Sequence, residues 1–227
     1  AWESVARKLA HEIKNPLTPI QLTIDRLKNK YENLIQGEEK LNFDNHLKTI
    51  AKQIKQIENL VNEFSDFARM PKPTIKKKDI VEIIKNNINL LKNIDNNIII
   101  NFNFSNDIIN ISCDEDQINR VFLNLIKNSI ESIKEKQQKG EVFSKKIDIE
   151  IMLENDYIKV IIIDNGIGFS SVNLANITKP YFTTKSKGTG LGLPIVNKIL
   201  NDHNADIKFI NQKNGAKIEI FFQKNVN

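Results

Sequence analysis

Apolar residues near the N-terminus recur with the period of an α-helix. They stand three or four residues apart, which places them on one helix face. Pro16 and Pro19 lie within this stripe, and each removes a backbone N–H group. Because the stripe continues in phase beyond both prolines, we favour one kinked helix over two separate helices. Its members are Trp2, Ala6, Leu9, Ile13, Leu17, Ile20, Ile24, Leu27, Tyr31 and Leu34.

A second stripe predicts another helix from about residue 43 to residue 68. Its apolar positions alternate at steps of four and three, which is the pattern of a heptad seam. Residues 36–40 indicate a turn, so the two helices should form an antiparallel hairpin. A hairpin alone buries one stripe on each helix, and pairing two hairpins closes a four-helix core, so we predict a homodimer. The seam consists of Phe43, Leu47, Ile50, Ile54, Ile57, Val61, Phe64 and Ala68.

The sequence Met70-Pro71-Lys72-Pro73 ends the helical part, because a proline disfavours helical geometry in the residue before it. From Thr74 onward, helical patterns alternate with β-rich runs. We therefore predict two domains, residues 1–73 and 74–227, the second an α+β layer with one sheet and helices on one face. The expected helices are 80–91, 115–136 and 190–201; the expected strands are 98–104, 109–112, 147–153, 157–163, 207–210 and 218–222, with a loop-rich segment at 164–189.

Composition excludes several classes of protein. The chain is 40% hydrophobic and 27% charged, which is typical of globular domains rather than of disordered chains. No apolar run approaches the roughly 20 residues that cross a bilayer. Cys113 is the only cysteine, which rules out an internal disulfide and favours a reducing compartment. The net charge of +5 comes from scattered lysines, and the run at 76–78 is typical of a linker or strand edge, so we expect no nucleic-acid partner and no membrane contact.

His11 lies two residues from both Leu9 and Ile13. At about 100° per residue it points roughly 200° away from the apolar stripe, so its imidazole should face solvent. Glu12 adjoins it, and Asn15 follows one turn later on the same side. An exposed neutral imidazole beside a carboxylate can attack a phosphoryl group while the carboxylate takes the ring proton. The alternative is an incidental surface histidine, the commoner case for a lone histidine.

Two glycine-rich segments in the second half suggest a nucleotide site. Asp164-Asn165-Gly166-Ile167-Gly168 follows an apolar strand, and a carboxylate there can accept a hydrogen bond from the exocyclic amine of adenine. Taken alone, this segment is more typical of a tight turn. Gly188-Thr189-Gly190-Leu191-Gly192 opens a helix, whose free N–H groups favour phosphate. Its spacing does not match the dinucleotide-binding fingerprint.

Asn124 and Asn128 stand one turn apart on the long helix expected at 115–136. A carboxamide oxygen suits Mg²⁺, although solvated asparagines are the ordinary alternative. Phe182 and Lys185 precede the second glycine segment, where the lysine is suited to neutralising phosphate charge; residues 168–188 form a candidate lid. The two asparagines lie opposite much of the helix surface formed by Phe122, Leu125, Ile126 and Ser129.

These motifs together resemble the sensor histidine kinases, whose five sequence boxes are named H, N, G1, F and G2. The resemblance covers nearly the whole chain, and residues 11–22 resemble the nitrogen-regulation NtrY-like branch. It implies a dimeric four-helix bundle followed by an α/β sandwich ATP-binding domain of the histidine kinase, gyrase and Hsp90 type. The matching residues are His11-Glu12-Ile13-Lys14-Asn15-Pro16, Asn124 with Asn128, Asp164-x-Gly-x-Gly168, Phe182 with Lys185, and Gly188-x-Gly-x-Gly192.

The resemblance also implies a role for each motif. His11 would accept the γ-phosphate of ATP with Glu12 as base, then pass it to an aspartate of a response-regulator receiver domain. Asn15 would orient water when that partner is dephosphorylated, Asn128 would hold Mg²⁺, and Asp164 would recognise adenine. The rest of the nucleotide site would comprise Asn124, Gly166, Gly168, Phe182, Lys185, Gly188, Gly190, Leu191 and Gly192.

Two other classes of function compete with this one. The first is a fold-related ATPase or chaperone, in which the position of Asn124 is a glutamate that activates water; the asparagine disfavours it. The second is a dimeric scaffold that binds nucleotide without transfer, which His11 and Glu12 disfavour. Because the chain begins inside a helical pattern, we expect a fragment of a longer protein with an upstream sensor. We expect this part in the cytoplasm and the longer protein anchored in the inner membrane.

Overall fold

The computed structural model of the chain forms two compact units. The first comprises Ala1–Pro71 with Lys185–Leu191, and the second comprises Lys72–Thr184 with Gly192–Asn227. Within the described ranges, no helix combines the length and the apolar character needed to span a membrane. For residues 2–7, 9 and 175 only the backbone is described; the described residues are 2–92, 95, 97–106, 108–169, 174–179, 182–183 and 188–224.

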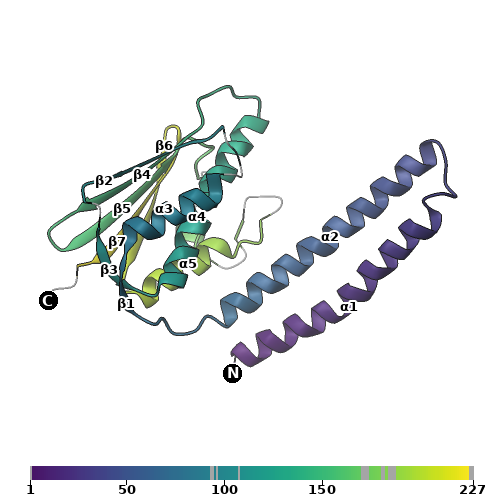
Figure 1. Cartoon of the computed structure of the whole chain (residues 1–227), viewed down its shortest axis with the longest axis horizontal. Helices are drawn as coiled ribbons and strands as arrows, with labels where there is room; N and C mark the ends of the chain where they lie inside the picture. The colour runs from purple at the N-terminus through teal and green to yellow at the C-terminus, as the bar shows by residue number, and fades with distance from the viewer. Residues whose placement is uncertain are drawn as a thin grey trace. The chain divides into compact units, whose positions relative to one another are not determined.

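A hairpin of two long helices makes up most of the first unit: α1 (Trp2–Tyr31) and α2 (Glu38–Ala68) (Figure 1). Helix α1 runs through Pro16 and Pro19, so the prediction of one helix rather than two is confirmed. Because proline has no N–H, the carbonyls of Glu12 and Asn15 lose their usual donors four residues later.

Helix α2 begins earlier than its apolar seam predicts. Glu38, Glu39 and Lys40 were expected in the turn, and that boundary is wrong, because these residues form the first turn of the helix. Two acidic side chains at this end complement the positive end of the helix dipole. Gly37 precedes the helix with a φ of 68°, a conformation that glycine adopts without strain.

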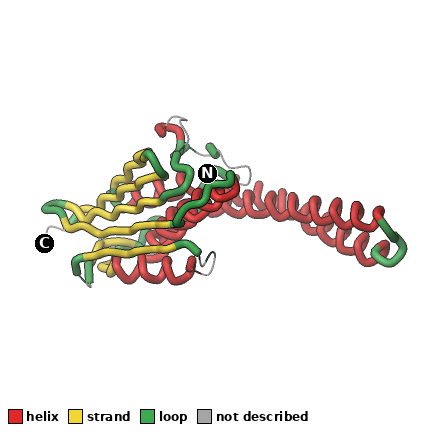
Figure 2. The backbone as a smooth tube through the Cα atoms, turned by 90° about the horizontal axis from the view of Figure 1, so that it is seen from above, coloured by secondary structure: helices red, strands yellow, loops and turns green. Residues whose placement is uncertain are grey.

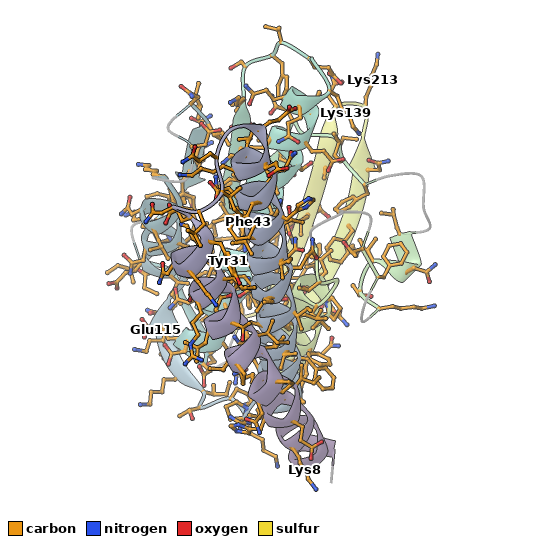
Figure 3. All side chains as sticks on the ribbon, turned by 90° about the vertical axis from the view of Figure 1, so that its right-hand side faces the viewer. Lys8, Tyr31, Phe43, Glu115, Lys139 and Lys213 are labelled. Atoms are coloured by element: carbon orange, nitrogen blue, oxygen red, sulfur yellow. The ribbon has the colours of Figure 1, made fainter. Side chains whose placement is uncertain are left out.

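Only part of each predicted apolar stripe is buried inside the hairpin. Leu17 and Ile24 of α1 form a core cluster with Leu47 and Ile54 of α2, and each of the four is at most 7% exposed. At the turn end, Tyr31 and Phe43 lie close together with ring centroids 6.5 Å apart (Figure 3). Four further stripe residues are 39–45% exposed, namely Ile20, Leu27, Ile50 and Ile57, and Leu34 is 72% exposed.

A five-stranded sheet with helices on one face forms most of the second unit (Figure 1, Figure 2). The strand order is β2-β4-β5-β7-β6; β2 is parallel to β4, and the other neighbours are antiparallel. The strands are β2 (Ile99–Phe104), β4 (Lys146–Leu153), β5 (Tyr157–Asp164), β6 (Asp206–Gln212) and β7 (Gly215–Gln223). The helices are α3 (Ile80–Lys92), α4 (Glu115–Gln138) and α5 (Gly192–Asp202), with a short 3₁₀ turn, η1, at Leu174–Asn176.

The core of this unit lies between the sheet and its helices. On β4, the inward residues Ile147 and Ile149 are fully buried, Asp148 between them is half-buried, and Lys146 and Glu150 on either side are exposed. This alternation is typical of a sheet with one covered face. Phe122 and Leu125 of α4 are also fully buried. The predicted α+β layer is therefore confirmed.

One strand does not belong to the main sheet as predicted. Strand β3 (Asn110–Cys113) pairs with β1 (Lys76–Asp79) in a separate two-stranded antiparallel sheet, so the lysine run is a strand and not a linker. The Asp79 carboxylate accepts hydrogen bonds from the backbone N–H groups of Val81 and Ile109, both at 3.0 Å, which ties the start of α3 to the segment before β3. Cys113 is fully buried, and burial raises the pKa of its thiol to about 11.

Candidate nucleotide and phosphoacceptor sites

His11 lies on the exposed side of α1, as the helical phase predicts. The buried side of the same helix is marked by Ala10, which is 4% exposed. Glu12 and Asn15 are exposed as well. The Nζ atom of Lys8 lies 3.9 Å from Oε1 of Glu12, but both side chains are largely in solvent, so this ion pair is weak and leaves the carboxylate accessible.

Asp164 ends strand β5 with its side chain toward the helices, and it is only 4% exposed. Its Oδ1 accepts a hydrogen bond from the N–H of Gly166 at 3.0 Å, and its Oδ2 accepts one from the hydroxyl of Ser129 on α4 at 3.0 Å. Both carboxylate oxygens are therefore held by donors from the protein. The carboxylate is presented in one defined orientation at the end of the strand.

The loop after Asp164 packs too closely on its neighbours for any side chain at its glycines. A Cβ at Gly166 would lie 2.6 Å from the carbonyl carbon of Ser132 on α4. Gly168 has a φ of 74°, and a Cβ there would lie 2.7 Å from the carbonyl oxygen of Gly215. These glycines let the loop lie directly on the helix and on the end of β7. The Asp164-x-Gly-x-Gly168 spacing thus reflects close backbone approach as well as turn geometry.

Asn165 fixes the same loop to the start of β4. Its side-chain amide donates to the carbonyl of Ser144 at 2.6 Å, and its Oδ1 accepts from the N–H of Lys146 at 2.9 Å. The backbone carbonyl of Asn165 accepts from Nζ of Lys136 on α4 at 3.2 Å. Contacts to two elements hold the loop in place before any ligand binds, which favours a preformed site.

Asn124 and Asn128 lie one turn apart on α4, and both are half-buried. The amide of Asn124 donates to the carbonyl of Arg120 at 2.8 Å, so its oxygen is oriented away from its own helix backbone. A Cβ at Gly192 would lie 3.2 Å from that oxygen. The last glycine of the second glycine-rich segment, which begins α5, is therefore next to Asn124, and the two predicted motifs meet.

The remaining predicted residues fall in or beside less fully described segments. Phe182 is half-buried, and its N–H donates to the carbonyl of Lys179 at 3.2 Å. Gly188 is exposed, Gly190 has a φ of 70°, and Leu191 is fully buried. The predicted Lys185 lies outside the described residues, as do positions 170–173, 180–181, 184 and 186–187 of the candidate lid.

Three residues that contact Asp164 or the loop after it were not predicted from the sequence. Ser129 was assigned to the apolar face of the helix, and it is 2% exposed, but its hydroxyl contacts Asp164. The hydroxyl of Ser132 accepts a hydrogen bond from the N–H of Ile167 at 3.1 Å. Gly215, with a φ of 100°, lies against the backbone of Asp164. Of the three, only Gly215 could have been found from the local sequence, since it follows an asparagine and Asn-Gly pairs are typical of hairpin turns.

The amide oxygens on α4 and the carboxylate at the end of β5 fit a nucleotide with a bound Mg²⁺. Amide oxygens such as those of Asn124 and Asn128 are hard ligands, and Mg²⁺ held partly by phosphates needs few protein oxygens. A buried carboxylate with two fixed donors suits recognition of an amine on a base. Backbone N–H groups at the start of a helix such as α5 can bind phosphate.

Comparison with known proteins covers both units. The family described as His Kinase A (phospho-acceptor) domain matches residues 1–73. The family described as Histidine kinase-, DNA gyrase B-, and HSP90-like ATPase matches residues 113–226. An NtrY-like sensor histidine kinase of Rickettsia felis is 41% identical over 223 residues, which is 98% of this chain but 36% of the relative. The chain thus corresponds to little more than a third of that protein.

Two solved structures share the fold. Full-length ShkA in complex with AMPPNP aligns with a TM-score of 0.70 and 19% identity, covering 98% of this chain and 46% of ShkA. The histidine kinase ThkA in complex with the response regulator protein TrrA aligns with a TM-score of 0.65 and 21% identity, covering 98% and 61%. Both family matches and the NtrY-like relative confirm the resemblance seen in the motifs: the chain belongs to the sensor histidine kinases and groups with their NtrY-like members.

Proposed function

We propose that this chain is the catalytic core of an ATP-dependent protein-histidine autokinase. The observation that carries the proposal is the exposed imidazole of His11 with the Glu12 carboxylate beside it, on a helix of the phosphoacceptor type. The second unit belongs to an ATP-binding family and supplies the donor. The phosphoryl group then passes from His11 to an aspartate of a response regulator.

The chemistry requires little beyond position and charge. A neutral ring nitrogen of His11 attacks the γ-phosphorus of ATP, the bond from that phosphorus to the bridging oxygen breaks, and ADP leaves. The phosphorylated ring releases its proton, which Glu12 accepts as general base. Phosphoryl transfer of this kind depends mainly on alignment and on electrostatic stabilisation of the phosphate oxygens.

We assign adenine recognition to Asp164, because its buried carboxylate is fixed by two donors at the end of β5. Asn128 would hold Mg²⁺, which neutralises phosphate charge when bound, and Asn124 would lie beside it at the start of α5. The remaining assignments follow the family resemblance and shape the nucleotide site: Gly166, Gly168, Phe182, Lys185, Gly188, Gly190, Leu191 and Gly192.

We further propose that the chain acts as a homodimer. Ile20, Leu27, Ile50 and Ile57 are large apolar side chains left exposed on one hairpin, and a second hairpin would cover them.

We place the domain boundary at residues 73 and 74, where the phosphoacceptor match ends. The ThkA structure contains a response regulator, which supports that class of partner here. We propose a cytoplasmic location, where ATP is available, and inner-membrane anchoring of the longer protein.

Incubation with γ-labelled ATP and Mg²⁺ tests this function. Wild-type chain should acquire label that is labile in acid and stable in alkali, as expected of a phosphoramidate. His11→Gln should acquire none. A matched control is His46→Gln, which changes an exposed histidine on α2 and should label like the wild type. Excess chelator should abolish labelling if Mg²⁺ is required.

The same experiment separates the competing functions. Steady release of labelled phosphate without labelled protein would indicate a fold-related ATPase. Nucleotide binding with neither label nor release would indicate a scaffold. Either result would overturn the kinase proposal.

A further inference from the structure

Ser129 makes a buried hydrogen bond to the carboxylate of Asp164. It follows Asn128 on α4 and is 2% exposed. Its hydroxyl lies 3.0 Å from Oδ2 of Asp164, a residue 35 positions later in the chain. Because an ionised carboxylate only accepts hydrogen bonds, the hydroxyl is the donor and the carboxylate the acceptor.

This contact differs from the usual behaviour of a serine within a helix. Such hydroxyls commonly bond to a carbonyl one turn earlier on their own helix, as Thr49 does here with the carbonyl of Asn45 at 2.7 Å. The Ser129 hydroxyl instead bonds to a carboxylate that is itself 4% exposed. A buried hydrogen bond to a charged group contributes more than a neutral one and costs more when one partner is removed.

The two hydrogen bonds to Asp164 fix the rotation of its carboxylate about the Cβ–Cγ bond. Rotation of a carboxylate about its Cβ–Cγ bond has broad minima, so one hydrogen bond leaves its plane poorly defined. The Gly166 N–H binds Oδ1 and the Ser129 hydroxyl binds Oδ2. A donor on each oxygen defines the plane, and with it the direction in which the carboxylate presents its lone pairs.

We propose that Ser129 is a positioning residue for purine selection, which holds the Asp164 carboxylate at the angle needed to accept a hydrogen bond from the exocyclic amine of adenine. The inference rests on the proposed role of Asp164 in adenine recognition. Hydrogen bonds weaken steeply as their angle departs from linearity, so a rotated carboxylate discriminates poorly. Ser129 itself contacts Asp164 and not the base.

The test compares ADP with purine riboside 5′-diphosphate, which is ADP without the amine, by calorimetric titration of the 227-residue chain with Mg²⁺. The wild type should prefer ADP. Ser129→Ala should lower the ratio of the two affinities about tenfold, the effect of one hydrogen bond to a charged group, with affinity for the amine-free nucleotide nearly unchanged. Ser65→Ala, at a buried serine of α2, is the matched control and should keep the wild-type ratio.

Two further variants distinguish positioning from a general structural role. Ser129→Thr keeps the hydroxyl, so it should retain most of the preference for ADP. In an Asp164→Asn background, Ser129→Ala should change the ratio no further, because the group it positions is gone. Thermal unfolding of each variant shows whether it is folded at the titration temperature.

Each outcome is decisive. An unchanged ratio in Ser129→Ala, or an equal loss of affinity for both nucleotides, would overturn the positioning role while leaving the kinase proposal intact. A wild-type chain that binds both nucleotides equally would refute adenine recognition by Asp164, and the Ser129 role with it. A wild-type chain that binds neither would contradict the kinase proposal itself.

Discussion

Asn15 lies one helical turn after His11, and both side chains are exposed on α1. A carboxamide there can orient a water molecule toward a phosphoryl group brought to His11 by the partner, and we expect it to have no part in the attack of the imidazole. We therefore expect Asn15→Ala to leave autophosphorylation unchanged and to slow dephosphorylation of the phosphorylated receiver domain about tenfold, the loss of one hydrogen bond. Time courses of both reactions with labelled phosphate check this. Equal loss of the two activities would show that Asn15 does not act in dephosphorylation alone.

For single residues, the local sequence pattern predicted more of the phosphoacceptor site around His11 than of the nucleotide site around Asp164. The exposure of His11 depends only on helical phase, so the sequence was sufficient to place it. The contact of Ser129 with Asp164 joins residues 35 positions apart and depends on how α4 packs against β5. The close approach of Gly215 to Asp164 depends likewise on the register of β5 and β7. No spacing in the sequence encodes such packing.

Among the strands, β7 carries a carboxylate whose titration links pH to stability. Glu219 is 7% exposed, and its carboxylate lies 2.6 Å from Nζ of Lys217 and 3.2 Å from Nζ of Lys159 on β5. The hydrogen bond from Lys217, followed by that from Lys159, holds the pKa of Glu219 below its ordinary value of 4.5, against the opposing effect of burial.

A lowered pKa means that the folded state binds the proton less tightly than the unfolded state. The stabilisation is therefore complete above about pH 4.5 and is lost as the pH falls through the lower, folded-state pKa. Glu219→Gln should lower the free energy of unfolding by about 1 kcal/mol at neutral pH and should flatten its decline in acid. Denaturant unfolding at a series of pH values measures both. The control is Glu150→Gln, at an exposed carboxylate of β4, whose free energy of unfolding should decline in acid as that of the wild type does. If the free energy of unfolding of Glu219→Gln declined in the same way, the linkage would be disproved.

Secondary structure was predictable where the pattern was periodic and longer than a few residues. Helices α3 and α4 and strands β4 and β5 have nearly the expected bounds. The lysine run of strand β1 was expected as a linker or strand edge. Its lysines carry no alternating pattern, and its pairing with β3 joins segments far apart in the chain. The early start of α2 at Glu38 depends on charge at the helix end rather than on apolar period.

For the whole molecule, the exposed residues of the hairpin seam predict the oligomeric state. Ile50 and Ile57 are 45% and 42% exposed on α2, so pairing of hairpins should bury about half of each side chain. If each contributes about 1 kcal/mol, the four in a dimer contribute about 4 kcal/mol, and changing both to alanine should raise the dimer Kd about a thousandfold. Sedimentation equilibrium measures this constant. Ile99→Ala, at a 54% exposed isoleucine of β2, is the control; a Kd unchanged by the α2 substitutions would place the interface elsewhere.

In the proposed reaction, one exposed imidazole on the helical unit receives the phosphoryl group of a nucleotide held by the other unit. Mapping the modified residue most directly tests it: the wild-type chain is incubated with ATP and Mg²⁺, digested at alkaline pH to preserve a phosphoramidate, and the added phosphoryl group is located by mass spectrometry. We expect the modification on the ring of His11 and its absence from His46 and His203. A phosphoryl group on any other residue would contradict it.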